Sequence, residues 1–386
     1  MKKIIILLVV AAVIVTVALT GVACKSATTT TTAAAETTAV TAAETAAATT
    51  AAETTAAPAK KFKIAMSNPI VNNAWGQAYM KIFDYVAKDP LYSDRIETKI
   101  YTCDYSAEAQ AAQIDGLILE GYDAIVVAAS SATGLNEAIK RADEAGIIVV
   151  TASQVAVSPN CWQMRDNYEE VAMSNAKFIA EKLDGKGKIF VDRGLPGVEG
   201  ANPLYDGALA VFKTYPGIEV VFTFDSMYTE GDTLAGVQAG LATNPQVDGV
   251  YSQGYVSPII KALKEAGRPP CVIAGYSYNG GMLDLLNNPG YEAIITHESP
   301  GASAMGLKMA LDLLEGTKDW SKGELIIIPT IYWATDTTID CGVPLEKLEM
   351  GVNVFEDVPP GFMMPTVHPE VGVIVPNEAV LVPDIS

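Results

Sequence analysis

The strongest constraint on the fold of this chain is a regular alternation of short apolar runs with amphipathic stretches of helical period, from Lys61 to Ile331. In its first half, the pattern predicts strands at residues 62–66, 96–102, 124–129 and 147–151. Helices are predicted between them, at about residues 76–88, 107–120 and 133–145. Because this alternation is typical of right-handed βαβ units, we expect a parallel sheet with helices on its faces.

The alternation then restarts and predicts a second sheet. Its expected strands are residues 188–192, 219–224, 249–252, 272–275 and 293–296, with a further strand at 324–331. A weak internal repeat supports two similar halves, since residues 123–151 and 248–275 both read strand, loop, helix ending in Glu-Ala-Gly, and strand. We therefore predict an α/β fold with two doubly wound, Rossmann-like lobes and a small-molecule cleft between their strand ends.

The N-terminus is predicted to be an export signal. Two lysines precede an uncharged apolar run, residues 4–23, that ends in small residues directly before Cys24. The stretch LTGVAC is similar to a bacterial lipoprotein processing site, although Gly21 stands where an aliphatic residue is usual. Three outcomes stay open: a lipoprotein modified on Cys24 after removal of residues 1–23, an uncleaved signal anchor, and simple cleavage with release. All three place the rest of the chain on the extracytoplasmic face.

Residues 24–60 are rich in Thr and Ala and have no apolar period, so we expect a disordered tether that holds a soluble module near a membrane. The whole chain has 26 basic and 45 acidic residues and a net charge of −19. Residues 1–60 contain four lysines and three glutamates, so the acidity belongs to the part that follows. Nucleic acid and an anionic membrane surface are therefore disfavoured as partners of the folded part.

The loop after the first predicted strand carries the first candidate binding residues. Asn72 and Asn73 offer hydrogen-bond donors and acceptors, and Trp75, at the mouth of the next helix, offers a flat apolar face. Amides beside an aromatic ring suit a polyhydroxylated ring, which has hydroxyl edges and a C–H face. The competing interpretation is that the asparagines only shape the turn and that Trp75 belongs to the core.

Several stretches, in order along the chain, resemble the ribose-type, class I family of periplasmic sugar-binding proteins. They are SNPIVNNAW, GYDAIVVAASSATGLNEAIKRADEAGIIVV, Arg165-Asp166-Asn167, VDGVYSQ, CVIAGYS and YEAIITHESP. The resemblance implies two lobes joined by a hinge with three crossovers, which close on one small ligand in a monomer without a cofactor. It also implies delivery of the ligand to the permease of an ABC importer, or to a signalling receptor. The lobes are expected at residues 61–163 with about 298–331, and at residues 164–297.

The resemblance places ligand-binding residues on both lobes. The positions that match the family's ligand positions are Asn73, Trp75, Ser153, Gln154, Asn202, Gly254, Ser277 and His297. Four of them stand at or near positions where sugar binders often have a charged side chain: Ser153, Gln154, Asn202 and Ser277. Charge is thereby removed from the expected site, which leaves a sugar as the expected class of ligand and the particular sugar open.

Further candidates lie at neighbouring strand ends. Gln253, Tyr255 and Tyr276 are expected to compensate with amide, phenol and ring contacts. Arg165 either reaches the cleft or pairs with a carboxylate on a lobe surface. Asp166 is expected to cap the helix that starts near residue 168.

Enzyme functions are disfavoured by what the sequence lacks. It contains two histidines, no Cys or His-Glu pattern with metal-ligand spacing, no GxGxxG and no P-loop, so neither a metal nor a nucleotide site is predicted. The nearest catalytic pattern surrounds Ser277, but Asn279 stands where a nucleophile elbow needs glycine. A serine hydrolase using Ser277 remains as one alternative. The other is a sensor ectodomain that presents a nucleoside or another non-sugar metabolite to a membrane receptor.

Four cysteines follow Cys24, and export permits disulfides among them. They are Cys103, Cys161, Cys271 and Cys341. Pairing and free buried thiols both stay open. Residues 332–386 exceed what the family needs after its last strand, and their short Val- and Pro-rich runs predict an ordered extension packed on a lobe.

Lipid on Cys24 gives the first testable prediction. Cys24→Ser should move the protein from the membrane fraction to the soluble fraction, because the acyl chains would be the anchor. Mass spectrometry of the mature N-terminus provides the independent check, and an unmodified Cys24 in the wild-type protein would contradict the prediction.

Overall fold

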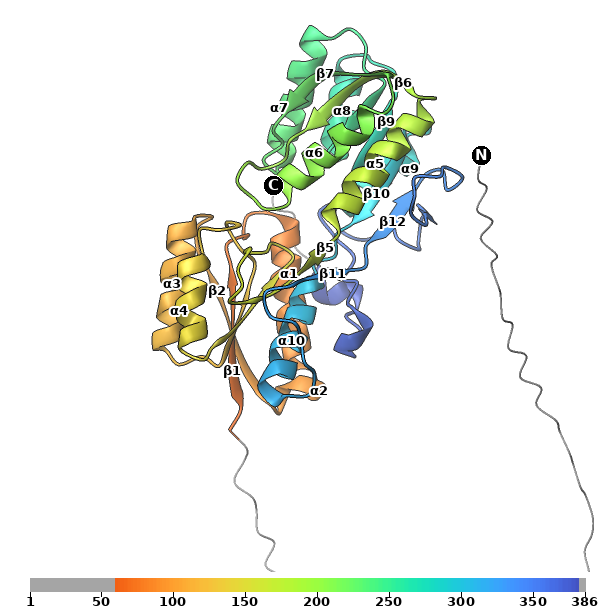
Figure 1. The fold of residues 1–386 in the computed structure, drawn as a ribbon. Coiled ribbons are helices and arrows are strands. Elements are labelled where there is room, and N and C mark those ends of the chain that lie inside the picture. The colour runs from red at the N-terminus through yellow and green to blue at the C-terminus, as the bar shows by residue number, and fades with distance from the viewer. Residues whose placement is uncertain (1–59, 382–386) are drawn as a thin grey trace, which may run out of the picture. The chain divides into compact units, whose positions relative to one another are not determined.

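The computed structural model describes residues 60–381; the predicted signal segment, Cys24 and most of the predicted tether lie outside the described residues. The described chain forms two α/β lobes, each built on one sheet with helices on both faces (Figure 1). This confirms the doubly wound two-lobe fold predicted from the alternation of strands and helices. No helix within residues 60–381 is long and apolar enough to cross a bilayer.

The first sheet has six parallel strands in the order β11-β5-β4-β3-β1-β2. Its strands are β1 (Phe62–Asn68), β2 (Ile96–Thr102), β3 (Ala124–Val127), β4 (Ile148–Ala152), β5 (Trp162–Asp166) and β11 (Leu325–Ile328). Its helices are α1 (Ala74–Lys88), α2 (Pro90–Ser93), α3 (Ala107–Leu119), α4 (Asn136–Glu144) and α10 (Ala302–Glu315). Alternate strand residues face opposite sides, so Ile64 and Met66 pack with α1 and α10 while Ala65 packs with α3 and α4.

The second sheet has seven strands in the order β13-β12-β10-β9-β8-β6-β7, and only the β10–β12 pair is antiparallel. Its strands are β6 (Lys186–Asp192), β7 (Gly217–Phe224), β8 (Gly249–Tyr251), β9 (Val272–Tyr276), β10 (Glu292–His297), β12 (Ile331–Ala334) and β13 (Glu346–Lys347). Its helices are α5 (Tyr168–Lys182), α6 (Ala201–Phe212), α7 (Glu230–Thr243), α8 (Ser257–Glu265) and α9 (Asn279–Asn287). The order β7-β6-β8-β9-β10 repeats the order β2-β1-β3-β4-β5, which agrees with the internal repeat.

Two features differ from the expectations. The strand expected at 324–331 is two strands on different sheets, β11 and β12, separated by Pro329 and Thr330. Proline has no N–H for a ladder and a fixed φ, so the chain leaves the first sheet there and enters the second. In addition, β5 extends the first sheet to Asp166, a few residues beyond the expected lobe boundary.

The C-terminal extension contacts both lobes rather than one. Tyr332 and Trp333 are buried in the second lobe, whereas Phe362 and Val371 belong to the core cluster of the first. Two short 3₁₀ helices, η1 (Pro369–Val371) and η2 (Asn377–Val380), lie in its last part. The four cysteines after Cys24 are free thiols, and all of them except Cys103 are buried.

The packing of α10 on the first sheet gives a stability prediction with an internal control. A Cβ on Gly306 would lie 2.8 Å from Val126 Cγ1 and 3.2 Å from the Ala152 Cβ, both of which are buried in the sheet. Gly306→Ala should therefore lower the free energy of unfolding by about 1–3 kcal/mol, through overpacking. Gly116→Ala in α3 has open space around its Cβ and should raise it by about 0.5–1 kcal/mol. Chemical denaturation of both variants measures the two changes, and an equal effect would contradict the packing of α10.

Candidate ligand-binding site

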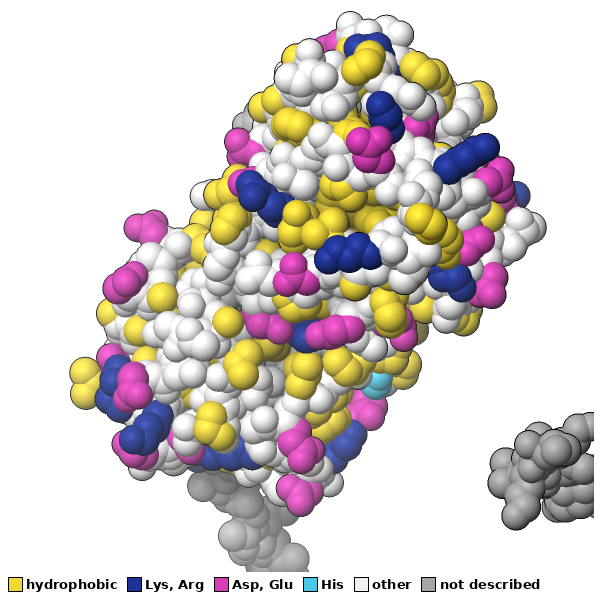
Figure 2. All heavy atoms as spheres, turned by 45° about the horizontal axis from the view of Figure 1, so that its top comes forward, with side chains coloured by type: hydrophobic (Ala, Val, Ile, Leu, Met, Phe, Trp, Pro, Cys, Tyr) yellow, Lys and Arg dark blue, Asp and Glu magenta, His cyan; other side chains and the backbone are white. Residues whose placement is uncertain are grey.

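A cavity of about 510 Å³ lies between the two lobes, at the carboxyl ends of strands from both sheets. Figure 2 shows hydrophobic side chains gathered along the band in which the two lobes meet. The volume is typical of small-molecule sites, and doubly wound sheets bind ligands at this edge. The lining consists of residues 69–75, 103–105, Gln154, Tyr168, Leu195, Gly200, Leu204, 227–229, 253–255, 276–278, Glu298 and Met363.

Nine of the residues predicted from the sequence line this cavity. They are Asn72, Asn73, Trp75, Gln154, Gln253, Gly254, Tyr255, Tyr276 and Ser277. They lie at or shortly after the carboxyl ends of β1, β4, β8 and β9, so residues far apart in the chain meet because parallel strands end at one edge of each sheet.

The loop after β1 is held by its own side chains. Asn68 closes the turn, with Nδ2 donating to Ile70 O at 3.0 Å and Oδ1 accepting from Ile70 N at 3.1 Å. Asn73 is the N-cap of α1, and its Oδ1 accepts from Gly76 N at 2.8 Å. Gly76 is required because a Cβ there would lie 1.9 Å from Ile70 O. Asn73 therefore shapes the turn and also lines the cavity.

Trp75 combines the two roles that the sequence left open. Its ring stacks on Tyr79 of α1 with centroids 4.9 Å apart, and it packs against the core cluster of the first lobe. Its Nε1 donates to the backbone oxygen of Glu298 at 3.2 Å, which fixes the orientation of the indole. The half-buried ring lines the cavity as well.

Glu298 is a cavity residue that the sequence reasoning missed. Its Oε1 accepts from Ser153 Oγ at 2.9 Å and lies 3.4 Å from the Tyr168 hydroxyl. Burial raises the pKa of this carboxyl, although the two hydroxyl contacts oppose the shift. A Glu directly after His297, in the matched stretch HESP, was the available sequence signal.

Six tyrosines line the cavity, of which only Tyr255 and Tyr276 were expected. They are Tyr105, Tyr168, Tyr228, Tyr255, Tyr276 and Tyr278. Burial first, and then the charge of Glu298, raise the pKa of Tyr168, Tyr228 and Tyr276 well above the ordinary value. These phenols therefore stay protonated and able to donate, beside ring faces that suit the C–H side of a sugar.

Two buried polar atoms in the lining have no hydrogen-bond partner within residues 60–381: Gln154 Oε1 from the first lobe and Tyr276 Oη from the second. A buried polar atom without a partner costs free energy, so such atoms call for an explanation. A bound ligand with hydroxyl groups would satisfy both of them. The pair spans the cavity from lobe to lobe, which fits a ligand held between the two.

The second-lobe wall depends on the buried carboxylate of Asp192, at the end of β6. It accepts from the backbone N–H groups of Gly194, Ser226 and Gln253 at 2.8–3.0 Å. The side chain of Gln253 donates in turn to Asp192 O and Ala201 O, and its Oε1 accepts from the Tyr228 hydroxyl. One residue thus fastens the loops after three strands, and Gln253 is placed by that network.

Backbone strain is concentrated around the cavity. Four non-glycine residues within 60–381 have positive φ, and two of them, Met227 (49°) and Tyr228 (54°), line the cavity. A third, Ser153 (68°), donates to the cavity residue Glu298. Such conformations are costly for residues with a Cβ and are frequent at ligand sites.

Four predicted residues lie outside the lining: Ser153, Asn202 and His297, and also Arg165. Ser153 sits behind Glu298, and Asn202 is exposed on α6. His297 is buried behind Ser277, with Nδ1 2.8 Å from Ser277 Oγ and its ring stacked on Trp333. Ser153, Asn202 and His297 each lie one layer or one helix face away from the cavity. Their position near a strand end or helix start in the sequence does not reveal this.

Arg165 is buried among acidic groups rather than in the cavity. Its Nε lies 3.1 Å from Glu199 Oε2, its terminal nitrogens contact the carboxylate of Glu169 at 3.3–3.4 Å, and it stacks over the Tyr168 ring. The expected cap of α5 is also corrected. Asn167 is the N-cap, and its side chain accepts from Glu170 N, whereas Asp166 accepts from Thr330 Oγ1.

The electrostatic character of the lining is acidic. Its ionisable groups other than phenols and one thiol are Asp104 and Glu298, and it contains no Lys, Arg or His. An anionic ligand would therefore meet no opposite charge there. Within the described residues, no three His, Cys, Asp or Glu side chains are grouped as metal ligands.

The hydrolase alternative meets an incomplete arrangement. Ser277 Oγ is hydrogen-bonded to His297, but the other ring nitrogen lies 2.8 Å from Thr366 Oγ1 instead of a carboxylate. Burial lowers the pKa of His297 to about 4. A Ser-His-acid triad relies on a carboxylate to orient the histidine and stabilise its protonated form, and this pair has none.

Two lobes of this strand order around one cavity define the type I class of solute-binding proteins. Residues 64–318 match the model of the periplasmic binding protein domain, and the chain belongs to this family, in its ribose- and galactose-type class. The family consists of binding proteins. The resemblance seen in the sequence is thereby confirmed.

Two characterised relatives share part of the sequence. The xylitol-binding protein of Mycolicibacterium smegmatis is 24% identical over 243 residues, which are 62% of this chain and 69% of that protein. The ribose import binding protein of Bacillus subtilis is 22% identical over 263 residues, which are 67% of this chain and 84% of that protein.

Solved structures show the same fold. An ABC transporter solute-binding protein from Thermobispora bispora is 27% identical, with a TM-score of 0.64 over 70% of this chain and 84% of that one. One from Actinobacillus succinogenes with bound D-allose is 18% identical, with a TM-score of 0.62 over 70% and 97%. The fructose-binding periplasmic domain of a hybrid two-component system is 21% identical, with a TM-score of 0.62 over 70% and 90%.

The unpartnered hydroxyl of Tyr276 gives a prediction that needs no ligand. Tyr276→Phe should leave the stability of the ligand-free protein unchanged or raise it, because it removes an unsatisfied polar group. Tyr251→Phe is the matched control, since the buried Tyr251 hydroxyl donates to Leu204 O at 3.0 Å. The Tyr251→Phe variant should lose about 1 kcal/mol of its free energy of unfolding. Thermal and chemical denaturation compare the two, and an equal loss would mean that the Tyr276 hydroxyl has a structural partner.

Proposed function

We propose that this protein captures an uncharged sugar or sugar-like polyol in the interlobe cavity and delivers it to the permease of an ABC importer. The observation that carries the proposal is the pair of buried, unpartnered polar atoms on opposite lobes, Gln154 Oε1 and Tyr276 Oη. Both match what ligand hydroxyl groups can supply, and Trp75 with the cavity tyrosines offers apolar faces for the C–H side of the ring.

The charges of the lining narrow the ligand class. Asp104 and Glu298 disfavour uronates, sugar phosphates and other anions, since no cation of the lining would offset them. The absence of Arg also sets the site apart from what was expected for sugar binders in general. Carboxylate, amide and phenol groups remain as partners for the ligand hydroxyls.

The relatives support the sugar and transport parts of this proposal. They include the xylitol-binding and ribose import binding proteins and structures with sugar ligands. Family membership favours an extracytoplasmic location, and the Cys24 stretch favours a lipid tether to the membrane. A sensor role is the alternative, because one structural neighbour is the periplasmic domain of a two-component system. Co-purification with a permease or with a receptor kinase distinguishes the two partners.

A thermal-shift panel with matched variants tests the binding function. A neutral sugar or polyol should raise the melting temperature by mass action, while its uronate or phosphate counterpart should not. In calorimetric titration, Gln154→Ala and Tyr276→Phe should each weaken the binding free energy of the best neutral ligand by about 0.5–1.5 kcal/mol, because each loses one hydrogen bond. Asn202→Ala removes an exposed amide on α6 and should leave the affinity unchanged.

Two results would contradict this assignment. One is a rise in the melting temperature with amino acids or nucleosides and no rise with sugars or polyols. The other is unchanged affinity in both cavity variants, which would mean that the ligand binds elsewhere.

A further inference from the structure

The two lobes are connected four times, once more than the hinge expected from the family. The first three connections follow β5, β10 and β11, and they correspond to the expected crossovers. The fourth is made by residues 355–381, here called the C-terminal strap, which leave the second lobe and end on the first. The strap lies beyond residue 318, where the match to the family domain ends.

At its start the strap is fastened to α9 of the second lobe by four hydrogen bonds, two from the side chain of Asn279 and two between backbone groups. Asn279 clasps Phe355, with Nδ2 donating to Phe355 O at 2.7 Å and Oδ1 accepting from Phe355 N at 2.8 Å. The backbone N–H groups of Asn279 and Gly280 donate to Phe362 O and Pro360 O at 2.8 and 2.7 Å. Asn279 is fully buried, so these bonds are shielded from water.

The middle of the strap lies at the hinge and reaches the cavity. Met363 is part of the cavity lining, and Met364 packs against the core clusters of both lobes. Thr366 contacts His297 at the end of β10 through its hydroxyl, and its carbonyl accepts from Ser299 in the following hinge segment.

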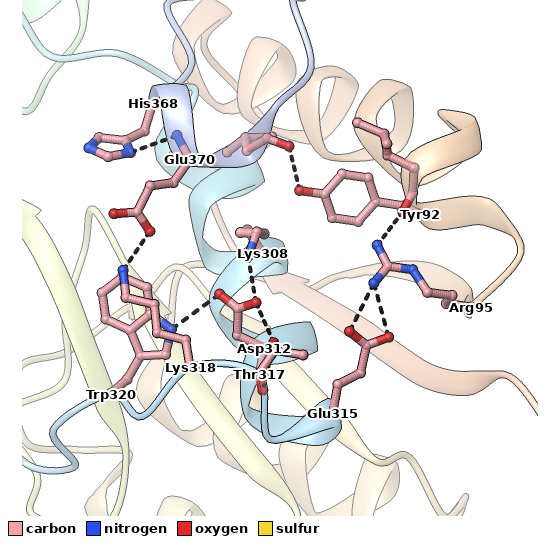
Figure 3. A network of polar contacts seen from close by, with 12 residues as sticks. Tyr92, Arg95, Lys308, Asp312, Glu315, Thr317, Lys318, Trp320, His368 and Glu370 are labelled. Atoms are coloured by element: carbon pink, nitrogen blue, oxygen red, sulfur yellow. Dashed lines mark hydrogen bonds and ion pairs between the residues drawn. The ribbon is translucent and has the colours of Figure 1, made fainter.

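The end of the strap is anchored on the first lobe (Figure 3). Val371 O accepts from the buried Tyr92 hydroxyl at 2.7 Å, and Glu370 pairs with Lys318 at 2.6 Å. The side chains of Val371, Val375 and Val380 are buried in the core cluster of this lobe.

We propose that the C-terminal strap limits how far the two lobes open and supplies Met363 as a specificity-determining wall of the binding cavity. Hinged binding proteins close around their ligands, so a connection fixed at both ends restricts the angle that the open state can reach. Phe362, whose backbone oxygen is bound by Asn279 of the second lobe, already belongs to the core cluster of the first lobe, so little chain separates the two attachments. The strap also remains beside the cavity, so the ligand meets Met363 at one side.

Small-angle scattering of the ligand-free protein tests the limit on opening. Asn279→Ala removes both side-chain bonds to Phe355. Gly280→Ala keeps a helical residue in α9 but places a Cβ 2.9 Å from the Pro360 Cβ, which pushes the strap away. Both variants should increase the radius of gyration and the hydrogen exchange of residues 355–366.

Asn353→Ala is the matched control. Asn353 is also a buried amide that binds two main-chain groups, Lys347 O and Glu349 N, both at 3.0 Å, but these lie within six residues of it in the chain and outside the strap. It should lower the melting temperature without changing the scattering. Unchanged scattering in the two strap variants, or an equal change in the control, would overturn the limit on opening.

The role of Met363 rests on the proposed function and is tested separately with the best neutral ligand of the panel. Met363→Ala should change the order of affinities for pentoses, hexoses and their polyols, because the shorter side chain enlarges the cavity on that side. The strap variants should weaken binding several-fold, because a wider-open protein spends a smaller fraction of its time in the closed form that binds the ligand. An unchanged order of affinities would overturn the specificity role of Met363. If the wild type bound no sugar at all, that would overturn the proposed function but not the limit on opening, because the scattering experiment needs no ligand.

Discussion

Glu298 is the residue on which the geometry of the cavity depends. Its backbone oxygen holds the indole of Trp75, and its carboxylate holds Ser153 and lies against Tyr168. It follows β10 directly, in one of the segments that connect the lobes, so it touches both walls of the site. A buried carboxyl is costly unless hydroxyl groups or a ligand offset the loss of water, and this cost explains why its surroundings are so polar.

The same region concentrates charge around the hinge. Arg165 at the end of β5 contacts Glu169 and Glu199, and burial together with the charge of Glu298 raises the pKa of the neighbouring Asp166. More carboxyls than cations meet here, which makes the hinge region sensitive to proton uptake and to the hydrogen bonds that a ligand brings. The cavity and the hinge are therefore one polar system rather than two separate features.

Part of the site could be predicted because its residues lie next to recognisable strand ends. Asn73, Trp75, Gln154 and the pair Tyr276-Ser277 all lie at or shortly after the ends of strands whose apolar runs are plain in the sequence. The sequence could not distinguish these cavity residues from residues that lie one layer behind the cavity wall. His297 ends a strand just as Tyr276 does, yet it faces the strap and Ser277 instead of the cavity.

The sequence by itself determined the α/β class, the two-lobe plan, the family and the sheet edge at which the cavity lies. These follow from local periodicity and from short motifs, since strand-helix alternation leaves few topologies. Only the tertiary structure decided which polar atoms remain without partners, that Glu298 and Met363 enter the cavity, and that the last 27 described residues, 355–381, fasten both lobes. The reason is physical: satisfaction of a buried polar atom, and packing of a segment with little regular structure, depend on neighbours far away in the chain.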